Sequence, residues 1–333
     1  MLYPLVFRPI FQERIWGGRR LAELYGKPLP PDVPIGESWE ISDRPGAVSV
    51  IVNGALAGQD LHWLVENHAA ELLGAAPASH GRFPLLVKIL DAREALSLQV
   101  HPPAAKAAEL SGEPKTEVWY VAEAAPGAQL YAGLRRGVTR AEFERKLRAG
   151  TVAECFHRLA VKAGDALFLP SGRVHALGAG LVVFEIQQSS ETTYRVFDWQ
   201  RTGRDGRGRE LHLAEALASI DFDDFEPRLV GGEFAGAGPV RVRPLVSHPL
   251  FNAEAWQLEA ETEAPLGGGK MHILGLVSGR ARVRDARGEA ALAAGQFCVV
   301  PAVLQGVQVR AETAAVLLRT EAGSGQDSPC QQR

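Results

Sequence analysis

The part of the chain that most constrains its fold is the segment Gly164-Asp-Ala-Leu-Phe-Leu-Pro170-Ser-Gly172-Arg-Val-His175. A glycine turn, a short apolar run and a Pro–Gly turn follow one another, which predicts a short strand held between two tight turns. The second turn directs the chain back toward the interior. We therefore expect the imidazole of His175 to face the inside of a β-structure.

A second segment alternates apolar and polar residues, Leu96-Ser97-Leu98-Gln99-Val100-His101. Successive side chains of a strand point to opposite faces, so the leucines and valine lie on one face and the polar residues on the other. The apolar face is predicted to be core. The polar face carries Ser97, Gln99 and His101 toward a site.

Glu117 adds a carboxylate to this predicted site. It lies in the β-rich run Lys115-Thr-Glu117-Val-Trp-Tyr-Val, where Lys115 and Glu117 share one face. A lone histidine is more often a surface or hydrogen-bonded core residue than a ligand. The joint set of Gln99, His101, Glu117 and His175, with two imidazole nitrogens and two oxygens, instead suits a divalent ion such as zinc, and manganese, iron or cobalt fit the same donors.

The spacing Gly-x5-Pro-x-Gly-x2-His resembles the second signature of the cupin barrels, with every fixed position filled. The first cupin signature departs from its usual form, because Gln99-x-His101 replaces His-x-His and the glutamate follows a longer insertion. This departure resembles the type I phosphomannose isomerases, in which Gln, His, Glu and His bind zinc. Other segments that look like that family are Arg14-Ile-Trp-Gly-Gly18, Gly36-Glu-Ser-Trp-Glu-Ile-Ser42, Leu85-Leu-Val-Lys-Ile-Leu90, Leu96-Ser-Leu-Gln-Val-His-Pro102 and Thr193-Tyr-Arg-Val-Phe-Asp-Trp199.

The resemblance implies a metal-dependent aldose–ketose isomerase that interconverts mannose 6-phosphate and fructose 6-phosphate through a cis-enediol. It implies one Zn²⁺ per chain, with other divalent ions as alternatives, bound by Gln99, His101, Glu117 and His175. Arg195, in the Thr-Tyr-Arg match, falls beside the metal, and Ser97 and Lys115 match active-site positions. Strand alternation in Leu181–Gln187 adds Glu185 as a candidate for proton transfer.

We therefore predict catalytic roles for Arg195, Glu185 and Lys115, and substrate binding by Ser97, Lys115 and Arg195. The alternatives are structural: a paired carboxylate for Glu185, a surface ion pair for Arg195, a hydrogen bond for Ser97 and a solvated charge for Lys115. Four residues in the matching segments receive no chemical role and are expected to be core or support residues: Trp16, Glu37, Trp39 and Glu40.

Short β-like runs bounded by Gly, Pro, Asn and Asp dominate the chain, which predicts a sandwich or jelly roll. The predicted fold is mainly β, with two cupin-like jelly-roll barrels and a few peripheral helices. The predicted strands are 48–52, 85–90, 96–100, 117–122, 158–161, 166–169 and 181–187, then 240–246, 255–259, 272–277 and 315–318. The predicted helices are 59–73, a helix from the capping box at Thr139 to near Gly150, and 211–219.

The flexible composition of 231–239 predicts a domain boundary. Residues 1–235 would form the catalytic cupin domain and 240–321 a degenerate cupin-like domain without metal, followed by a disordered tail over 322–333. The second domain is predicted from a faded repeat, Gly295-Gln-Phe-Cys-Val-Val-Pro301, in which Gly306 stands where the first segment has His175. Chance similarity of two Gly-strand-Pro turns is the alternative, and His272 is expected to be a local hydrogen-bonding residue.

Composition limits the partners. The chain has 333 residues, is 46% hydrophobic and carries a net charge of −3, so neither a nucleic-acid nor a membrane surface is expected, and the basic run Arg201 to Arg209 is predicted to be a solvated hairpin loop. No obligate protein partner is evident, which leaves a small-molecule sugar phosphate. Three widely spaced cysteines, no signal-like start and no membrane-length apolar run predict a cytoplasmic protein.

Two other functions fit the same barrel. A cupin oxygenase would use a metal, but it would be expected to favour a histidine-rich iron site over Gln99. A non-catalytic sugar-binding cupin would not need Lys115, Glu185 and Arg195 around the metal. The sequence also lacks a nucleotide-binding loop of the kind expected for an added guanylyltransferase activity.

Overall fold

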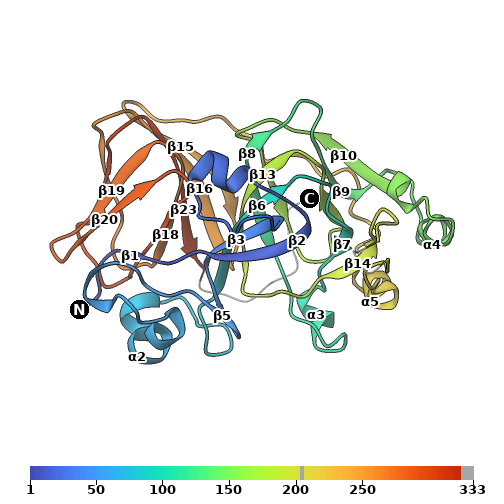
Figure 1. The fold of residues 1–333 in the computed structure, drawn as a ribbon, viewed down its shortest axis with the longest axis horizontal. Helices are drawn as coiled ribbons and strands as arrows, with labels where there is room; N and C mark the ends of the chain where they lie inside the picture. Colours follow the sequence, from blue (N-terminus) through green and yellow to red (C-terminus); the bar gives the residue numbers. More distant parts are fainter. Residues whose placement is uncertain (203–205, 324–333) are drawn as a thin grey trace.

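The computed structural model describes residues 1–202 and 206–323, and in these residues antiparallel β-sheets dominate (Figure 1). The first two sheets are built from β2 (Ile10–Gly18), β3 (Ile35–Ile41), β6 (Leu85–Ala92), β7 (Leu98–Val100), β8 (Glu117–Ala124), β9 (Gln129–Leu134), β10 (Phe156–Ala160), β11 (Ala166–Leu169), β12 (His175–Leu177), β13 (Leu181–Gln188) and β14 (Tyr194–Phe197).

The other two large sheets are built from β1 (Leu5–Val6), β15 (Val240–Ser247), β16 (Phe251–Leu258), β17 (Glu263–Pro265), β18 (His272–Ser278), β19 (Arg280–Arg284), β20 (Glu289–Ala293), β21 (Phe297–Val300), β22 (Gln308–Ala311) and β23 (Ala315–Ala322). A small hairpin joins β4 (Asp43–Arg44) and β5 (Ala47–Val48). The helices are α1 (Arg20–Tyr25), α2 (Leu61–Leu73), α3 (Ala104–Ala107), α4 (Arg140–Arg148) and α5 (Leu213–Ser219), with 3-10 turns at Gly54–Leu56 and Val152–Cys155.

The strand orders define four layers. A six-stranded sheet, β11-β8-β13-β6-β3-β2, faces a five-stranded sheet, β10-β9-β12-β7-β14, and the two share one apolar core that includes Trp119 and Leu177. A second six-stranded sheet, β1-β21-β18-β23-β16-β15, shares another core with the four-stranded sheet β17-β22-β19-β20. Figure 1 shows these two halves side by side, the orange-to-red sheets on the left and the cyan, green and yellow strands on the right, with β1 and α2 on the left.

The largest core lies between the two six-stranded sheets and also takes in α2. Phe184 of β13 and Phe297 of β21 meet there with ring centroids 5.4 Å apart, and Tyr25 packs edge-on against Phe184. Both faces of the first six-stranded sheet are therefore covered. This explains why β6 and β13 read as nearly continuous apolar runs, and why the rare polar residues in them, such as Lys88 and Glu185, point to a site.

Most predicted elements are confirmed. The predicted strand 166–169 coincides with β11, and 85–90, 117–122 and 181–187 fall within β6, β8 and β13. Thr139 caps α4 by accepting a hydrogen bond from the amide of Glu142, and Asp60 caps α2 in the same way through Trp63. The long strands β2 and β3 were not among the predicted elements.

Two predictions need correction, and part of one of them lies outside the described residues. The predicted strand 48–52 is not continuous: β5 ends at Val48, and Val50 and Ile51 form only isolated bridges. The predicted tail begins too early, because β23 includes Ala322 and the amide of Gly323 donates to Leu250; residues 324–333 lie outside the described part. The antiparallel bridge between Thr202 and Gly208 supports the hairpin predicted for the basic run from Arg201 to Arg209.

The basic run is not simply solvated, and this corrects the prediction for its two ends. Arg201 and Arg209 both form ion pairs with Asp198, whose side chain is only 6% exposed. A buried carboxylate that holds two guanidinium groups fixes the base of the hairpin against the five-stranded sheet. Residues 203–205 lie outside the described part of the chain.

The division at 235–240 stays a prediction. The strands after 240 do form sheets of their own, but β1 from the first residues of the chain joins them by pairing with β21. Lys27 also connects the N-terminal residues to the second pair of sheets. Its ammonium group binds the Glu40 carboxylate at 2.6 Å and the carbonyl oxygen of Gly295. Glu40 is thus a support residue, as predicted.

Helices long and apolar enough to cross a membrane are not found in residues 1–202 and 206–323.

Candidate active site

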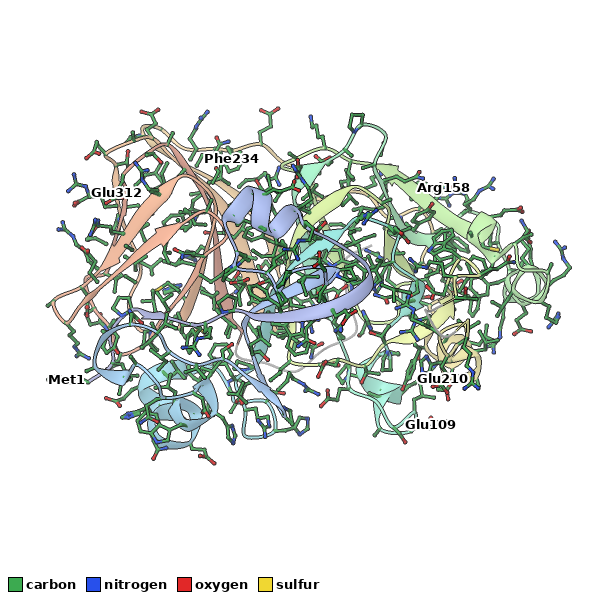
Figure 2. The ribbon with its side chains drawn as sticks, in the orientation of Figure 1. Met1, Glu109, Arg158, Glu210, Phe234 and Glu312 are labelled. Carbon is green, nitrogen blue, oxygen red and sulfur yellow. The ribbon has the colours of Figure 1, made fainter. Side chains whose placement is uncertain are left out.

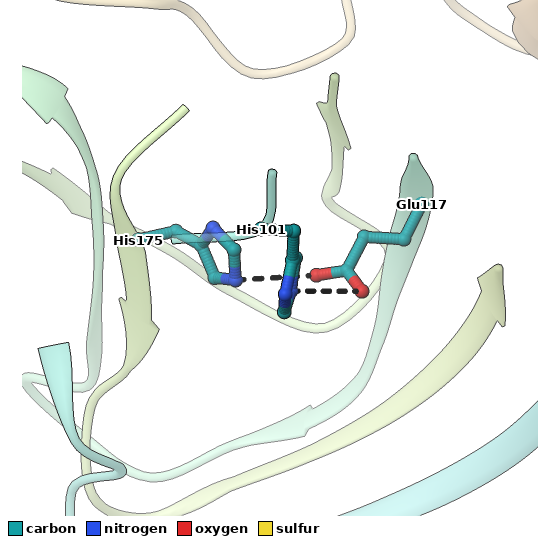
Figure 3. Close-up of side chains that lie close together, drawn as sticks. All are labelled: His101, Glu117 and His175. Atoms are coloured by element: carbon teal, nitrogen blue, oxygen red, sulfur yellow. Dashed lines mark ion pairs between the residues drawn. The ribbon is translucent and has the colours of Figure 1, made fainter. Parts of the chain in front are cut away.

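Three predicted ligands converge between the first two sheets. His101 follows β7, Glu117 opens β8 and His175 opens β12, and their ligand atoms lie within 4.8 Å of one another (Figure 3). Nε2 of His175 is 3.4 Å from Oε1 of Glu117, and Nε2 of His101 is 3.8 Å from Oε2. All three side chains are buried, so the group is enclosed by protein.

Backbone contacts fix the orientation of both imidazoles. Nδ1 of His101 donates to the carbonyl oxygen of Thr192 at 2.7 Å, and Nδ1 of His175 donates to that of Arg173 at 2.9 Å. A carbonyl accepts only, so each Nδ1 carries the proton and each Nε2 keeps its lone pair toward Glu117. This outer support is the arrangement that metal-bound histidines require.

The electrostatics keep both imidazoles neutral. Burial lowers the pKa of His175 to about 3, and burial together with the Lys115 cation holds the pKa of His101 well below its usual range. Burial also raises the pKa of Glu117, with Glu185 as the next contribution. A cation at the centre of the group would favour ionised Glu117, whose Oε1 is buried without a hydrogen-bond partner among the described residues.

Gln99 completes the predicted set from a strand between two others. On β7 it is directly opposite His175 of β12 on one side and Arg195 of β14 on the other. Its side-chain amide group is 3.3 Å from Nε2 of His175. Two neutral imidazoles, an amide and a carboxylate therefore fit a divalent metal ion, which was the prediction from the sequence.

Lys115 and Glu185 adjoin the three ligands. The ammonium group of Lys115 forms an ion pair with Glu117 and lies 3.4 Å from Nε2 of His101 and 3.7 Å from Oε1 of Glu185. Glu185 accepts a hydrogen bond from the indole of Trp119 at 2.8 Å. Lys115 is only 6% exposed, so the alternative of a solvated charge is wrong.

A cavity of about 400 Å³ opens beside these residues, a size suited to a small ligand. Its walls carry five cationic side chains against three carboxylates: Arg14, Lys88, Lys115, Arg195 and Arg209, and Glu37, Glu185 and Glu191. Ser97 and Gln99 also line it. The predicted site residues Ser97, Gln99, Lys115, Glu185 and Arg195 therefore share one cavity, whose positive excess favours an anionic ligand.

Arg195 has one open donor in this wall. Its Nη1 donates to the carbonyl oxygen of Glu210 at 2.7 Å, whereas its Nε is buried without a partner among the described residues. A buried guanidinium nitrogen without a hydrogen bond is costly. The contacts found for Arg195 therefore do not match the alternative of an ordinary surface ion pair.

The sequence interpretation missed several residues of this cavity. Lys88 of β6 is 3.3 Å from Oε2 of Glu37 and 3.6 Å from Oε1 of Glu185, and its ammonium group lies over the ring of Trp39. Glu37 also binds Arg14 at 2.7 Å and the Trp39 indole at 2.6 Å, and these cations hold the pKa of Glu37 at about 2 against the effect of burial. The sequence signal that could have identified Lys88 as a cavity residue is its position inside the otherwise apolar predicted strand 85–90.

Trp16, Trp39 and Glu37 therefore line the cavity, which corrects their assignment to core or support alone. Trp39 and Lys88 are paired across β3 and β6, and Lys88 and Glu185 across β6 and β13. Residues far apart in the sequence thus form one row across the sheet. That row cannot be read from any single strand.

Residues 5–139 of this chain match the catalytic domain of type I phosphomannose isomerase. The mannose-6-phosphate isomerase of Streptococcus mutans is 36% identical over 309 residues, which cover 92% of this chain and 95% of that protein. The probable mannose-6-phosphate isomerase GmuF of Bacillus subtilis is 34% identical, over 91% and 94%.

Solved structures agree with these relatives. The crystal structure of the mannose 6-phosphate isomerase from Bacillus subtilis superimposes with a TM-score of 0.86 and 28% identity, and covers 96% of this chain and 99% of that one. The match extends over both pairs of sheets. With its cavity, its metal-ligand group and this degree of similarity over nearly its whole length, the chain belongs to the type I phosphomannose isomerase family.

Proposed function

We propose that this protein interconverts mannose 6-phosphate and fructose 6-phosphate through a cis-enediol, with a divalent metal ion held by Gln99, His101, Glu117 and His175. The observation that carries the proposal is the cavity lined by Gln99, two buried lysines and Arg195, because its Lys115 directly contacts Glu117 and His101 of the metal-ligand group. The relatives' names supply the substrate, because they are mannose-6-phosphate isomerases.

The reaction moves a hydrogen between C1 and C2 of the sugar. A base removes the C2 proton of the aldose, and delivery of that proton to C1 gives the ketose, while the hydroxyl protons rearrange between O1 and O2. A bound divalent ion supplies Lewis acidity toward oxygen. The negative charge that develops on the enediol oxygens is best stabilised by fixed cations in a water-poor site.

The chain's own residues fit these tasks. Glu185 lines the cavity and lies 3.7 Å from the Lys115 ammonium and 3.6 Å from the Lys88 ammonium, so it is our candidate for holding the transferred proton. Lys115 and Arg195 supply positive charge beside the developing enediolate. Ser97 is 3% exposed and offers a hydroxyl group to a sugar oxygen.

Zinc is the metal we propose, since two imidazoles, a carboxylate and an amide suit it, one ion per chain. We also propose a cytoplasmic location. Cys155 and Cys298 are both buried as free thiols, which agrees with a reducing compartment.

The test is a coupled assay of mannose 6-phosphate isomerisation with metal-free and metal-restored protein. We expect activity to disappear with the metal and to return when Zn²⁺ is added. Metal-dependent oxygen consumption would instead support an oxygenase, and tight sugar-phosphate binding without turnover of the metal-loaded protein would support a binding protein. Either result would contradict the proposed reaction.

A further inference from the structure

We propose that Arg209 selects the phosphate group of the substrate, and that Asp198 is the positioning residue that holds Arg209 at the cavity. This inference rests on the proposed function, because it assigns the part of the cavity that would take the phosphate of a hexose 6-phosphate. Arg209 lies in the run that the sequence suggested was a solvated loop, yet it lines the same cavity as Arg195.

The placement follows from the order of strands. His175, Gln99 and Arg195 are successive partners across β12, β7 and β14, and β14 is the edge of the five-stranded sheet. Adjacent strands are about 4.8 Å apart, so Arg195 lies beside the metal ligand Gln99, on the side away from His175. Arg209 is bound to Asp198, the residue after β14, and so extends the wall from Arg195 rather than from the metal ligands. In a hexose 6-phosphate the phosphate on C6 is likewise at the end of the molecule away from the reacting carbons C1 and C2.

The Asp198 carboxylate fixes the Arg209 guanidinium beside β14. Nε of Arg209 donates to Oδ2 of Asp198 at 2.7 Å and Nη2 donates to Oδ1 at 2.5 Å, which leaves Nη1 outside this bidentate pair. Asp198 directly follows β14, so the carboxylate is attached to the strand that carries Arg195. Figure 2 places Glu210, the next residue along, on the same side of the molecule as β14 and α5 in Figure 1.

Three contacts tie this segment to Arg195. The carbonyl oxygen of Glu210 accepts from Nη1 of Arg195, the amide of His212 donates to the carbonyl oxygen of Arg195, and the amide of Arg195 donates to Nδ1 of His212. The two guanidinium groups are therefore held on one wall despite their like charge. A phosphate oxygen is the ligand chemistry that suits Nη1 of Arg209, which lies outside the Asp198 pair, while Arg195 stays beside the metal ligand Gln99.

Asp198 also joins a third segment to this wall. It forms an ion pair with Arg201, whose Nη1 donates to the carbonyl oxygen of Ala95 at 2.7 Å, two residues before Ser97. One buried carboxylate thus links the hairpin, the edge strand and the segment that carries Ser97. Loss of its charge is expected to loosen Arg209 without removing it.

The test compares Arg209→Ala and Asp198→Asn with Arg207→Ala, which removes the same charge from the same hairpin but does not line the cavity. For Arg209→Ala we expect KM for mannose 6-phosphate, and the inhibition constant for inorganic phosphate, to rise roughly 10- to 100-fold, with kcat within about twofold. Asp198→Asn should shift both constants in the same direction by a smaller factor. Arg207→Ala should behave like the unchanged protein.

Equal constants for Arg209→Ala and Arg207→Ala would overturn the inference, and so would a fall in kcat with KM unchanged. If Arg209→Ala does not fold, Arg209→Lys gives the same reading, because it keeps the charge but loses the fork. Binding of mannose 6-phosphate measured by calorimetry separates the two proposals. Absence of turnover in the unchanged protein would reject the isomerase, whereas equal phosphate affinity in the three variants would reject only the role of Arg209.

Discussion

At the scale of single residues, the site depends on side chains that the protein already holds in the orientation in which they would bind a metal ion. His101 and His175 each have Nδ1 bound to a backbone carbonyl, and Glu117 has a buried oxygen without a partner among the described residues. These contacts order the ligands and reduce the entropy lost on binding. The residues nearest the metal-ligand group are accordingly the ones whose changes we expect to separate metal binding from turnover.

Replacing His101 or His175 with alanine should lower metal content and activity together. Each change removes one nitrogen donor, and we expect metal affinity to fall by more than the roughly 100-fold that follows loss of an outer partner. Metal analysis beside the isomerase assay checks this. His272→Gln, at a histidine bound to the carbonyl oxygen of Gly267, is the matched control and should keep one ion per chain. Full metal occupancy in the His101→Ala, His175→Ala double variant would exclude this site.

Arg195→Lys should remain folded and metal-loaded but lose turnover. Lysine keeps the positive charge but loses the planar guanidinium group. In that group Nη1 donates to the carbonyl oxygen of Glu210 while Nε has no partner among the described residues. We expect kcat to fall roughly 10- to 100-fold, the loss typical of one charge-assisted hydrogen bond. Steady-state kinetics with metal content and thermal unfolding measured on the same preparation decide the matter; unchanged kinetics would refute the role.

At the scale of elements, short sequence signals that start and end helices and strands determine local stability. Thr139 begins α4 through its hydrogen bond to the Glu142 amide, and buried Asp91 near the end of β6 accepts from the Arg20 amide that begins α1. The Thr139 contact is near the surface, so its loss should change only the stability of α4. The Asp91 contact is buried, so it should also make the stability depend on pH.

Thr139→Ala should lower the free energy of unfolding by about 1 kcal/mol, because α4 loses its N-terminal cap. The helix lies at the outer end of the molecule next to β10 (Figure 1), and residues 140–148 do not line the cavity, so kcat and KM should stay as they are. Chemical denaturation measures the change. Thr139→Ser retains the hydroxyl group and serves as control; a loss of the same size with serine would show that the cap is not the cause.

Asp91 predicts a pH dependence of stability. Burial raises its pKa from 3.8 to about 6, so the folded protein holds this proton at a pH where the unfolded chain has released it. The contribution is therefore most favourable below pH 4 and is lost as the pH rises through about 6. Relative to the unchanged protein, Asp91→Asn should gain stability across this window. Parallel curves of unfolding free energy against pH would contradict the assignment.

At the scale of the whole molecule, the contact between the two six-stranded sheets makes the halves depend on each other. Phe297→Ala removes a ring from that contact and should cost about 3–5 kcal/mol. Since β1 and the largest core belong to both halves, we expect one unfolding transition by calorimetry and unchanged metal content in the folded variant. Two separate transitions would instead show that the halves unfold independently.

In the second pair of sheets, His272 has the same strand register as the metal ligand Glu117 has in the first pair. Glu117 is opposite Leu169, the residue before Pro170, and His272 is opposite Val300, the residue before Pro301. His272 therefore occupies the place of Glu117, but it binds the carbonyl oxygen of Gly267 and lies 3.6 Å from Glu321. This supports the prediction of a repeat without metal over 240–321, for which one ion per full-length chain is the expected stoichiometry.

The sequence by itself determined the parts of this protein that follow from local spacing. The Gly–Pro–Gly–His segment and the alternation before His101 predicted strands, the face of each strand and the four candidate metal ligands. Three of those ligands meet within 4.8 Å, and Gln99 is beside one of them. Such patterns are readable because a strand has a period of two and a turn has strict residue preferences.

Only the tertiary structure decided which distant residues complete the cavity. Lys88, Glu37 and Trp39 form part of one wall through the register of β3, β6 and β13, and Arg209 reaches it through Asp198. Register and ion pairing between distant segments are set by the packing of whole sheets, so no single segment encodes them. For the same reason the basic run alone predicts a solvated loop. Only the folded chain brings the buried carboxylate of Asp198 between Arg201 and Arg209.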